Sequence, residues 1–458
     1  MGVKCFSVTV TVVAVFACIA YQILLSPLPP PKISTTKYWG PSSQANRVEK
    51  SEVKPFKINY SADVISKLSN RLSEPLNLVE PLKNVNFRYG FDKHKLEELV
   101  KYWRDEYLPK WDGRQKFFNA LPQYTTKIQG LNIHFIHTKD QTDKAKYVIP
   151  LLLLHGWPSS VREFYNLIPE LTKAKDNIAF VVVAPSLPGY GFSEAAKVPG
   201  MNPNEIAIVF RNLMVRLGYD RFLIQGSDWG SLIGSSLAAL FPQNVIGFHS
   251  NMCVTGFFMN YIKAIIASVY PSLFVAAEYA DFHFPIGEKI AYHIEESGYF
   301  HLQATKPDTI GIALTANPVG LLAYILEKFS TLTDKNNRDL IDGGLDKHYT
   351  KEALLDNIMI YYLSNSITTS VRLYAEGFGI EYLNLKMDRV PVQVPVGCAR
   401  FKNDLAHELD WQLNVKFPKL IHSTYHANGG HFAAMELPDV LYNDFLQFVN
   451  KLNVTAKK

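Results

Sequence analysis

The feature that most constrains the fold of this chain is a series of short, almost continuously apolar segments that begins near residue 146. Strands buried on both faces are apolar throughout, as they are in a parallel sheet that has helices on each side. Segments of helical pattern separate the apolar segments, so the order predicts a doubly wound, mostly parallel α/β sheet. The expected strands are Val148–Leu154, Ile178–Ala184, Phe222–Gln225, Val245–Met252 and Val392–Ala399.

The strand series is interrupted between about residues 255 and 375, where the pattern is mainly helical and rich in tyrosine. An insertion that returns to the same sheet is typical of a lid. We therefore expect a core in two parts, 146–254 and 376–458, with a helical lid, 255–375, between them. A region of mixed helix and strand signals, 33–145, precedes the core and includes an amphipathic helix at Leu96–Tyr107.

The first 32 residues form a separate N-terminal segment. No charged residue lies between Lys4 and Lys32, and the apolar part, Cys5–Leu25, has the ~20 residues that a helix needs to cross a bilayer. The proline-rich stretch Ser26–Pro31 cannot continue such a helix. The length of the apolar run predicts an uncleaved transmembrane anchor and a spacer over residues 1–32, rather than a signal peptide that is removed.

The orientation of this anchor follows from its flanking charges. One lysine precedes the apolar run and four basic residues follow it by position 50, so the positive-inside rule places the body in the cytosol. Two acceptor sequences for N-glycosylation begin at Asn59 and Asn453, and we expect both to carry no sugar.

Composition excludes several classes of protein. The 47 basic and 42 acidic residues give a net charge of +5, too little to indicate nucleic-acid binding. Hydrophobic residues make up 47% of the chain, which excludes a disordered protein. Four cysteines are too few for a disulfide framework, and only Cys253 and Cys398 lie outside the apolar N-terminal run. This cysteine usage is typical of a reducing compartment.

The most informative motif is Gly226-Ser227-Asp228-Trp229-Gly230, between an expected strand and an expected helix at Ser231–Leu240. Its pattern is that of the nucleophile elbow, in which flanking glycines permit a tight strand-to-helix turn that exposes the central side chain. Here the central residue is Asp228, whereas in esterases it is serine. A carboxylate can attack a saturated carbon and form an ester with it, which predicts a covalent mechanism. Ser227 is off-centre in the elbow.

A second motif, His155-Gly156-Trp157-Pro158, follows the first expected strand. A loop at this place can direct backbone N–H groups toward an oxyanion. We expect the oxyanion hole to consist of the amides of Trp157 and of Trp229, the residue after the nucleophile.

A third motif, Gly429-Gly430-His431-Phe432, places a histidine on a glycine-rich loop near the C-terminus. The order nucleophile, acid, histidine makes His431 the expected general base. The acid that orients it should follow the Val392–Ala399 strand, where Asp404, Glu408 and Asp410 are all candidates.

The chain shows no convincing cofactor or metal motif. Gly189-Tyr190-Gly191 begins like a dinucleotide-binding sequence, but Glu194 stands where the third glycine should be. His134 and His137 are three residues apart on an expected strand and so face opposite sides. We expect neither a cofactor nor a metal ion.

Taken together, the elbow aspartate, the His-Gly-Trp-Pro motif and the Gly-Gly-His-Phe-Ala-Ala motif resemble those of the microsomal epoxide hydrolases, above all the juvenile hormone enzymes of insects. The segments 130–137 and 298–309 also resemble that family, and the resemblance covers nearly the whole chain. It implies an α/β-hydrolase fold with a helical lid and an N-terminal meander, and an enzyme of the endoplasmic reticulum membrane.

The resemblance also implies residue roles. Asp228 would be the nucleophile, His431 the base, and two lid tyrosines, Tyr299 and Tyr374, would hold the epoxide oxygen. Asp404 falls where the mammalian enzymes carry a glutamate, which implies that it is the acid. The substrate would be a lipophilic epoxide, either juvenile hormone or a xenobiotic, and the product a vicinal diol.

Three other functions are weighed against this hypothesis. A serine carboxylesterase is excluded if Asp228 occupies the elbow. A haloalkane dehalogenase shares the elbow aspartate but commonly binds halide with a lid tryptophan, and all six tryptophans here lie outside 255–375. A non-catalytic, membrane-tethered binding protein usually lacks part of the catalytic set, which is available here.

Overall fold

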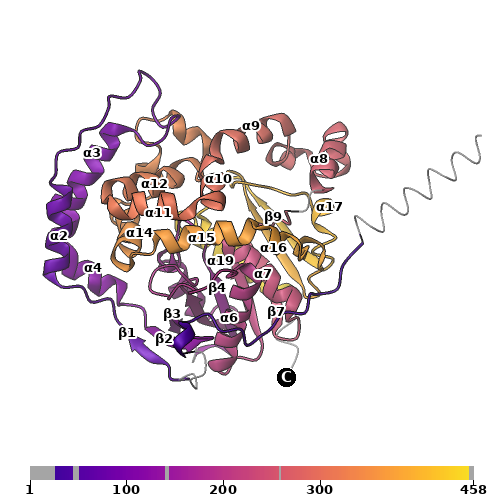
Figure 1. Ribbon diagram of the computed structural model, residues 1–458. Coiled ribbons are helices and arrows are strands. Elements are labelled where there is room, and N and C mark those ends of the chain that lie inside the picture. The colour runs from indigo at the N-terminus through magenta and orange to yellow at the C-terminus, as the bar shows by residue number, and fades with distance from the viewer. Residues whose placement is uncertain (1–25, 45–50, 140–143, 257–258, 453–458) are drawn as a thin grey trace, which may run out of the picture.

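A computed structural model describes residues 26–44, 51–139, 144–256 and 259–452 (Figure 1). The predicted transmembrane run, Cys5–Leu25, lies outside the described residues. Within the described part of the chain, no single helix is both long and apolar enough to span a membrane. One pair of helices, α11 (Pro307–Ala316) and α12 (Pro318–Thr331), meets that test together, with a bend of 120° between them.

The described residues form a nine-stranded sheet in the order β1-β2-β3-β5-β4-β6-β7-β8-β9. The pairs from β1 to β5 are antiparallel and the pairs from β5 to β9 are parallel, so the predicted doubly wound sheet carries an antiparallel extension. The strands are β1 Lys54–Phe56, β2 Gln123–Ile128, β3 Leu131–Thr138, β4 Tyr147–Leu154, β5 Ile178–Pro185, β6 Phe222–Gly226, β7 Val245–Ser250, β8 Val396–Phe401 and β9 Leu420–His426.

Two of the expected strands differ from the observed ones by more than one residue at an end. β8 starts at Val396, not Val392, since Pro395 lacks the N–H that a ladder requires. β7 ends at Ser250 rather than Met252. The helix predicted at Leu96–Tyr107 is α3, Lys93–Tyr102, which is followed directly by a π-helical turn over Trp103–Tyr107.

Helices cover both faces of the sheet. On one face α6 and α7 pack together against β2, β4, β6 and β7, and on the other α5 and α19 pack together against β5, β7, β8 and β9. Every residue of β5 is buried, as a central strand requires. The bounds are α5 Leu167–Thr172, α6 Pro203–Arg216, α7 Asp228–Leu240, α17 Asp410–Leu413, α18 Ala433–Glu436 and α19 Pro438–Lys451.

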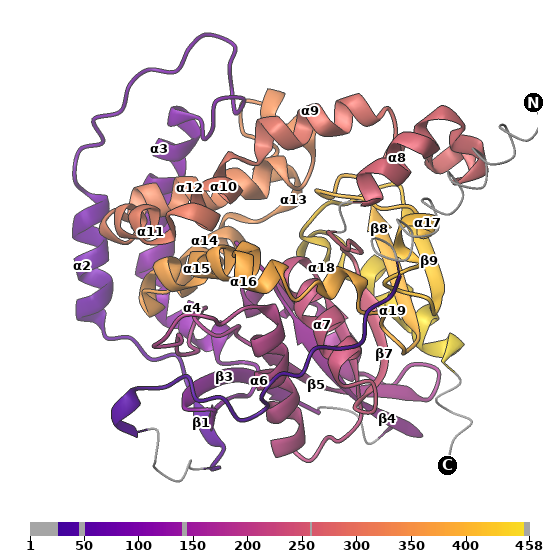
Figure 2. The same ribbon diagram turned by 45° about the vertical axis from the view of Figure 1, so that its right-hand side comes forward.

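Between β7 and β8 the described chain is helical, and Figures 1 and 2 show these helices gathered on one side of the sheet. We refer to them as the lid. Besides α11 and α12, the lid helices are α8 Met259–Val269, α9 Ile286–Glu296, α10 Gly298–Thr305, α13 Leu345–His348, α14 Lys351–Ser364, α15 Ile367–Phe378 and α16 Ile380–Leu383. The division into 33–145, 146–254, 255–375 and 376–458 stays a prediction from the sequence.

The N-terminal region forms the outer edge of the molecule, where α2 (Ala62–Leu72) and α3 pack against α12 of the lid (Figure 1). A buried carboxylate, Asp356 of α14, joins this region to core and lid. It accepts hydrogen bonds from Arg114 of α4 (Trp111–Phe118), from Arg162, and from the Tyr107 hydroxyl. Such a fully paired buried charge fixes how the three regions meet.

Cys253 and Cys398 form a disulfide bond. The two residues are 145 positions apart in the chain, but β7 and β8 are neighbours in the sheet and bring them together. The interpretation of the cysteines as those of a reducing compartment did not anticipate this bond. Local spacing carries no information about strand neighbours that are so distant in sequence.

Candidate active site

Asp228 occupies a strained turn between β6 and α7. Its φ angle is +47°, in the left-handed region that non-glycine residues seldom adopt. The flanking glycines make the turn possible, because a Cβ atom on Gly226 would lie 2.5 Å from the carbonyl oxygen of Gly230, and one on Gly230 would lie 2.1 Å from that of Leu154. The strand–turn–helix context of the predicted elbow is confirmed, and it leaves the Asp228 side chain 14% exposed.

Ser227, the off-centre alternative, points away from this position. Its Oγ donates a hydrogen bond to Oε1 of Glu163 at 3.1 Å, and both side chains are buried. The serine hydroxyl is therefore engaged beneath the elbow and does not share the exposure of Asp228.

The loop after β4 lies directly against the Asp228 carboxylate. The backbone N–H of Trp157 donates to Oδ1 of Asp228 at 2.7 Å. Only glycine fits at position 156, because a Cβ atom there would lie 2.0 Å from the same oxygen. The amide of Trp229 belongs to the first turn of α7, where backbone N–H groups have no intrahelical acceptor. Its part in an oxyanion hole stays a prediction.

His431 lies between two carboxylates. Its Nδ1 is 2.7 Å from Oδ1 of Asp404, and its Nε2 is 3.5 Å from Oδ2 of Asp228. The other two candidate acids are engaged elsewhere: Glu408 accepts hydrogen bonds from Asn260 and Thr255, and Asp410 pairs with Arg400. Asp404 is thus the candidate that the fold places on the imidazole.

The charges around His431 control its protonation. Burial alone would lower the pKa of His431, but the negative charge of Asp404 and the contact with Asp228 raise this pKa well above its usual value. Loss of the negative charge of either carboxylate would lower the pKa of His431.

The loop that carries His431 is clamped on both sides. Glu436 accepts hydrogen bonds from the N–H groups of Gly430 and Phe432, each at 2.9 Å. The N–H of His431 itself donates to the carbonyl oxygen of Leu332, directly after α12. Sequence analysis missed Glu436, whose signal was only a carboxylate five residues after the expected base.

The two predicted tyrosines come from different lid helices, Tyr299 from α10 and Tyr374 from α15, and their ring centroids lie 6.1 Å apart. The Trp157 ring stacks on Tyr299 at 5.4 Å and meets Tyr374 edge-on at 5.8 Å. Trp157 is thus in contact with both tyrosines and, through its amide, with Asp228. Burial raises the pKa of both phenols well above the usual value, so both stay protonated at neutral pH.

The residues that the sequence made poor candidates for a metal or dinucleotide site contact other protein groups. His134 is buried between Ser186 and Gln123, whereas the His137 ring contacts the Tyr219 hydroxyl. Gly191 donates its N–H to Ser366 of the lid, so the Gly-Tyr-Gly stretch lies against protein.

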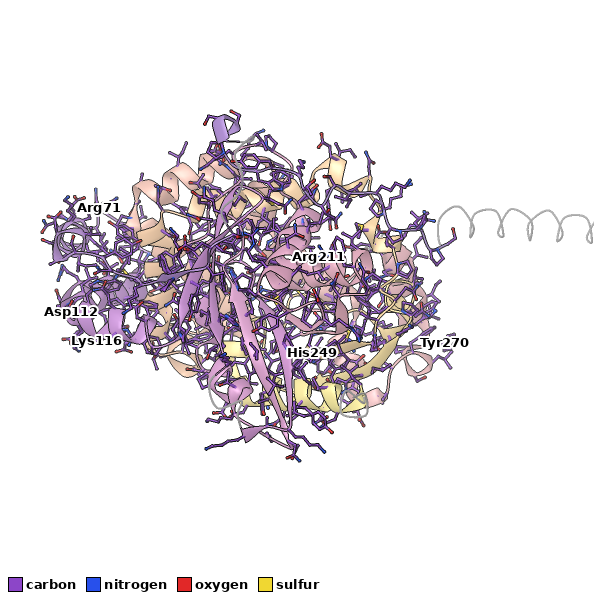
Figure 3. The ribbon with its side chains drawn as sticks, turned by 90° about the horizontal axis from the view of Figure 1, so that it is seen from below. Arg71, Asp112, Lys116, Arg211, His249 and Tyr270 are labelled. Atoms are coloured by element: carbon purple, nitrogen blue, oxygen red, sulfur yellow. A yellow bond between two sulfur atoms is a disulfide. The ribbon has the colours of Figure 1, made fainter. Side chains whose placement is uncertain are left out.

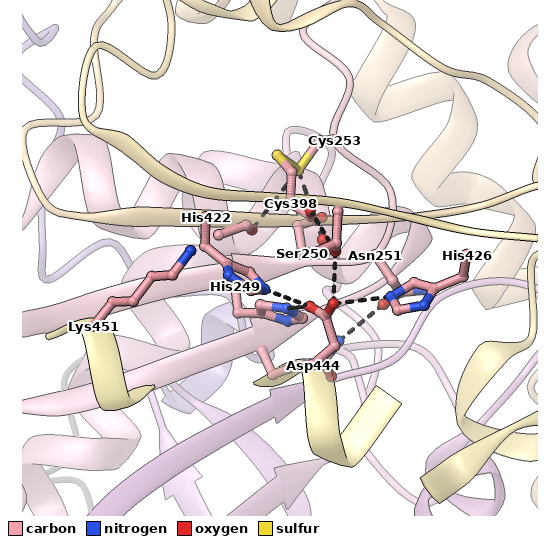
Figure 4. Close-up of polar contacts among 12 residues, drawn as sticks. His249, Ser250, Asn251, Cys253, Cys398, His422, His426, Asp444 and Lys451 are labelled. Carbon is pink, nitrogen blue, oxygen red and sulfur yellow. Dashed lines mark hydrogen bonds and ion pairs between the residues drawn. A yellow bond between two sulfur atoms is a disulfide. The ribbon is translucent and has the colours of Figure 1, made fainter. Parts of the chain in front are cut away.

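A cluster that the sequence did not indicate lies between the sheet and α19 (Figure 4), and Figure 3 labels its His249. Asp444 of α19 contacts the Nε2 atoms of His249, His422 and His426 at 2.9, 3.0 and 2.9 Å. It also accepts a hydrogen bond from Thr424 at 2.6 Å. Burial alone would raise the pKa of Asp444, but the three histidines lower it far below the usual value. These four donors hold α19 against β7 and β9.

Known proteins share this architecture. The family model described as "Epoxide hydrolase N terminus" matches residues 53–164, and that described as "alpha/beta hydrolase fold" matches residues 149–342. The juvenile hormone epoxide hydrolase of Bombyx mori is 46% identical over 94% of this chain and 93% of its own. Epoxide hydrolase 1 of Oryctolagus cuniculus is 41% identical over 90% of this chain and 92% of its own.

Solved structures agree with these relatives. The crystal structure of the Bombyx mori enzyme has a TM-score of 0.90 at 44% identity, covering 93% of this chain and all of that one. The Aspergillus niger epoxide hydrolase has a TM-score of 0.72 at 26% identity over 92% of this chain and all of its own. The chain described here is therefore an epoxide hydrolase and belongs to the microsomal epoxide hydrolase family.

Proposed function

We propose that this enzyme hydrolyses lipophilic epoxides to vicinal diols through an ester of Asp228. The carboxylate attacks one epoxide carbon, breaking its C–O bond and forming an alkyl ester. His431 then removes a proton from a water molecule that attacks the ester carbonyl, and Asp404 stabilises the imidazolium. As the tetrahedral intermediate collapses, the bond between the carbonyl carbon and the diol oxygen breaks, and that oxygen takes the proton from His431. The N–H groups of Trp157 and Trp229 hold the negative charge of the tetrahedral intermediate.

Tyr299 and Tyr374 act in the first step. Opening the ring converts a weakly basic ether oxygen into an alkoxide, and a donor that strengthens its hydrogen bond as this charge develops lowers the barrier. A protonated phenol can do so without itself ionising beforehand. Placing the two phenols on the lid leaves the nucleophile and the base on the core.

The observation that carries this proposal is the contact of the elbow carboxylate with both a backbone N–H group and a histidine that is paired with a second carboxylate. Asp228 meets the Trp157 N–H with one oxygen and the His431 Nε2 with the other. A carboxylate with a merely structural role needs neither a strained φ angle nor a histidine that is oriented by a second carboxylate.

The test is a single turnover with enzyme in excess over styrene oxide in oxygen-18 water. Because water attacks the ester carbonyl, the heavy oxygen should appear in the peptide containing Asp228 and not in the first-turnover diol. The same peptide from enzyme incubated without substrate is the control. A labelled diol with an unlabelled Asp228 would show direct attack by water and end the covalent mechanism.

For the substrate we propose juvenile hormone, an epoxidised terpenoid ester. Two observations support this choice: the names of relatives such as the Bombyx mori enzyme, and the aromatic surroundings of Asp228, which suit an apolar ligand. We expect kcat/KM for the hormone to exceed that for styrene oxide by about tenfold or more, which equals ~1.4 kcal/mol of transition-state binding. Equal values would favour a general detoxifying role.

We further propose a single-pass enzyme of the endoplasmic reticulum membrane, anchored by residues 5–25, with the catalytic body in the cytosol. The charge distribution around the apolar run supports this orientation. The Cys253–Cys398 disulfide is instead typical of an oxidising compartment. Asn59 is exposed, so its glycosylation in cells tests the orientation. A sugar on Asn59 would place the catalytic body in the lumen.

A further inference from the structure

A buried lysine that the proposed mechanism does not use lies against one of its tyrosines. Lys328 is in the last turn of α12 and is only 5% exposed. Its Nζ lies over the Tyr299 ring, 4.4 Å from the centroid. Long lysine side chains usually carry their ammonium group to solvent, so an ammonium held against an aromatic ring inside the lid calls for a reason.

The contacts of Lys328 fix the position of its charge. Nζ pairs with Oε2 of Glu327, the preceding residue, at 2.5 Å. The following residue, Phe329, stacks on Phe432 beside the catalytic histidine at 4.0 Å between centroids. The ammonium group of Lys328 is therefore held by Glu327, and the end of α12 that carries it is held by the stack of Phe329 on Phe432.

We infer that Lys328 is a positioning residue for Tyr299. The ammonium group of Lys328 strengthens the Tyr299 phenol as a hydrogen-bond donor when the epoxide opens. This inference rests on the proposed function, in which Tyr299 donates to the epoxide oxygen. A cation over an aromatic ring is attracted to its electron density, and the attraction grows as negative charge develops on the ring oxygen. Burial of the ammonium group makes the interaction stronger than it would be in water.

The inference predicts that only one of the two chemical steps depends on Lys328. Formation of the Asp228 ester requires the phenol donors, so it should slow when the cation is removed. Hydrolysis of the ester requires His431 and the backbone N–H groups, none of which contacts the Lys328 ammonium in the described structure. Its rate should not change.

The experiment measures both steps by rapid quench with the full-length enzyme, following the appearance and the decay of the Asp228 ester. We expect Lys328→Met to slow ester formation by about 3- to 30-fold while its decay stays at the wild-type rate. Lys328→Arg, which keeps a cation able to stack on the ring, should recover most of the lost rate. Lys263→Met is the matched control, because Lys263 is a lid lysine over a different ring, that of Trp411.

Lys328→Met removes the cation from the Tyr299 ring and also leaves Glu327 without its ion-pair partner. A second variant separates these two effects. Glu327→Gln/Lys328→Met removes both charges, and it should form the ester as slowly as Lys328→Met does. Ester formation at the wild-type rate in the double variant would overturn the inference, and so would equal slowing of both steps in Lys328→Met. A wild-type enzyme that forms no Asp228 ester would instead refute the proposed function on which the inference depends.

Discussion

The two sides of the site differ in how their residues are held. On the core side, Asp228, Asp404 and His431 follow the carboxyl ends of β6, β8 and β9, and polar contacts within hydrogen-bonding reach fix them. On the lid side, Tyr299, Tyr374 and Lys328 come from three helices and are held mainly by ring packing. In the proposed mechanism, the groups that exchange bonds and protons thus follow strands of the sheet, and the groups that stabilise charge on the epoxide oxygen are on the lid.

This difference explains why formation and hydrolysis of the proposed Asp228 ester can be measured as separate effects. In the proposed mechanism the ester forms only if both sides act together, because the carboxylate attacks while the phenols donate. The same mechanism has the ester break down through the core side alone. Variants of the two sides should therefore leave different kinetic signatures, and the predictions below are ordered from the largest expected effect on turnover to the smallest.

Replacing the base should have the largest effect and should be confined to the second step. We expect His431→Gln to form the Asp228 ester but to hydrolyse it about 10²- to 10⁴-fold more slowly, because the water loses its general base. Mass spectrometry of the intact protein should then show the accumulated adduct. His301→Ala, at an exposed position on α10, serves as the control and should accumulate none. If His431→Gln hydrolysed the ester at the wild-type rate, the division between core and lid would be wrong.

Removing both phenol hydroxyls should impair the first step. For Tyr299→Phe/Tyr374→Phe we expect ester formation to fall by about 10²- to 10³-fold, since the alkoxide loses its donors while the packing of the rings is kept. Rapid-quench measurement of the ester checks this rate. The decay of any ester formed should keep its wild-type rate, and a matching loss in decay would mean that the lid also serves the second step.

Removing the acid should change the pH dependence of ester hydrolysis. The negative charge of Asp404 raises the pKa of His431, so Asp404→Asn should lower the pKa of His431. The neutral base then persists to lower pH, and the acidic limb of the single-turnover hydrolysis profile moves in that direction. The rate at pH 7 should fall less than in His431→Gln. A limb that stays in place would exclude Asp404 as the partner of the imidazole.

The smallest effect on turnover is expected at the Asp444 cluster, within the core but away from the site. Asp444→Asn should leave kcat/KM unchanged and lower the free energy of unfolding at pH 7 by about 3 kcal/mol, because the buried His249 and His422 and the partly buried His426 lose their anionic partner. The folded-state pKa of Asp444 is lowered, so this stability is present above the ordinary aspartate pKa and is lost as the pH falls below it.

Denaturant unfolding measures this difference, and Asp439→Asn, at an exposed position on the same helix, is the control. The gap between the two variants should be widest at neutral pH and should narrow on acidification. A loss of activity in Asp444→Asn without a loss of stability would contradict the separation of this cluster from the chemistry.

Two residues of the core side, Asp228 and His431, could be predicted from the sequence because each lies in a short motif after an expected strand. The Gly226–Gly230 elbow needs its glycines for steric reasons that any backbone of this kind imposes, so the motif predicts the turn. The residues of the lid side could not be predicted from a local motif. Only the family resemblance selected Tyr299 and Tyr374 from the many lid tyrosines, since a tyrosine on a helix has no local mark of the site it faces.

By itself, the sequence determined the alternating order of strands and helices, the elbow with an aspartate at its centre and the candidate histidine. These features depend on steric and hydrophobic rules that act over a few residues. The motifs left Asp404, Glu408 and Asp410 open, and the tertiary structure places Asp404 on His431, as the family resemblance implied. The tertiary structure alone decided that Cys253 and Cys398 are bonded and that Lys328 covers Tyr299. Each of these facts depends on which segments become neighbours, and that is set by the packing of the whole chain.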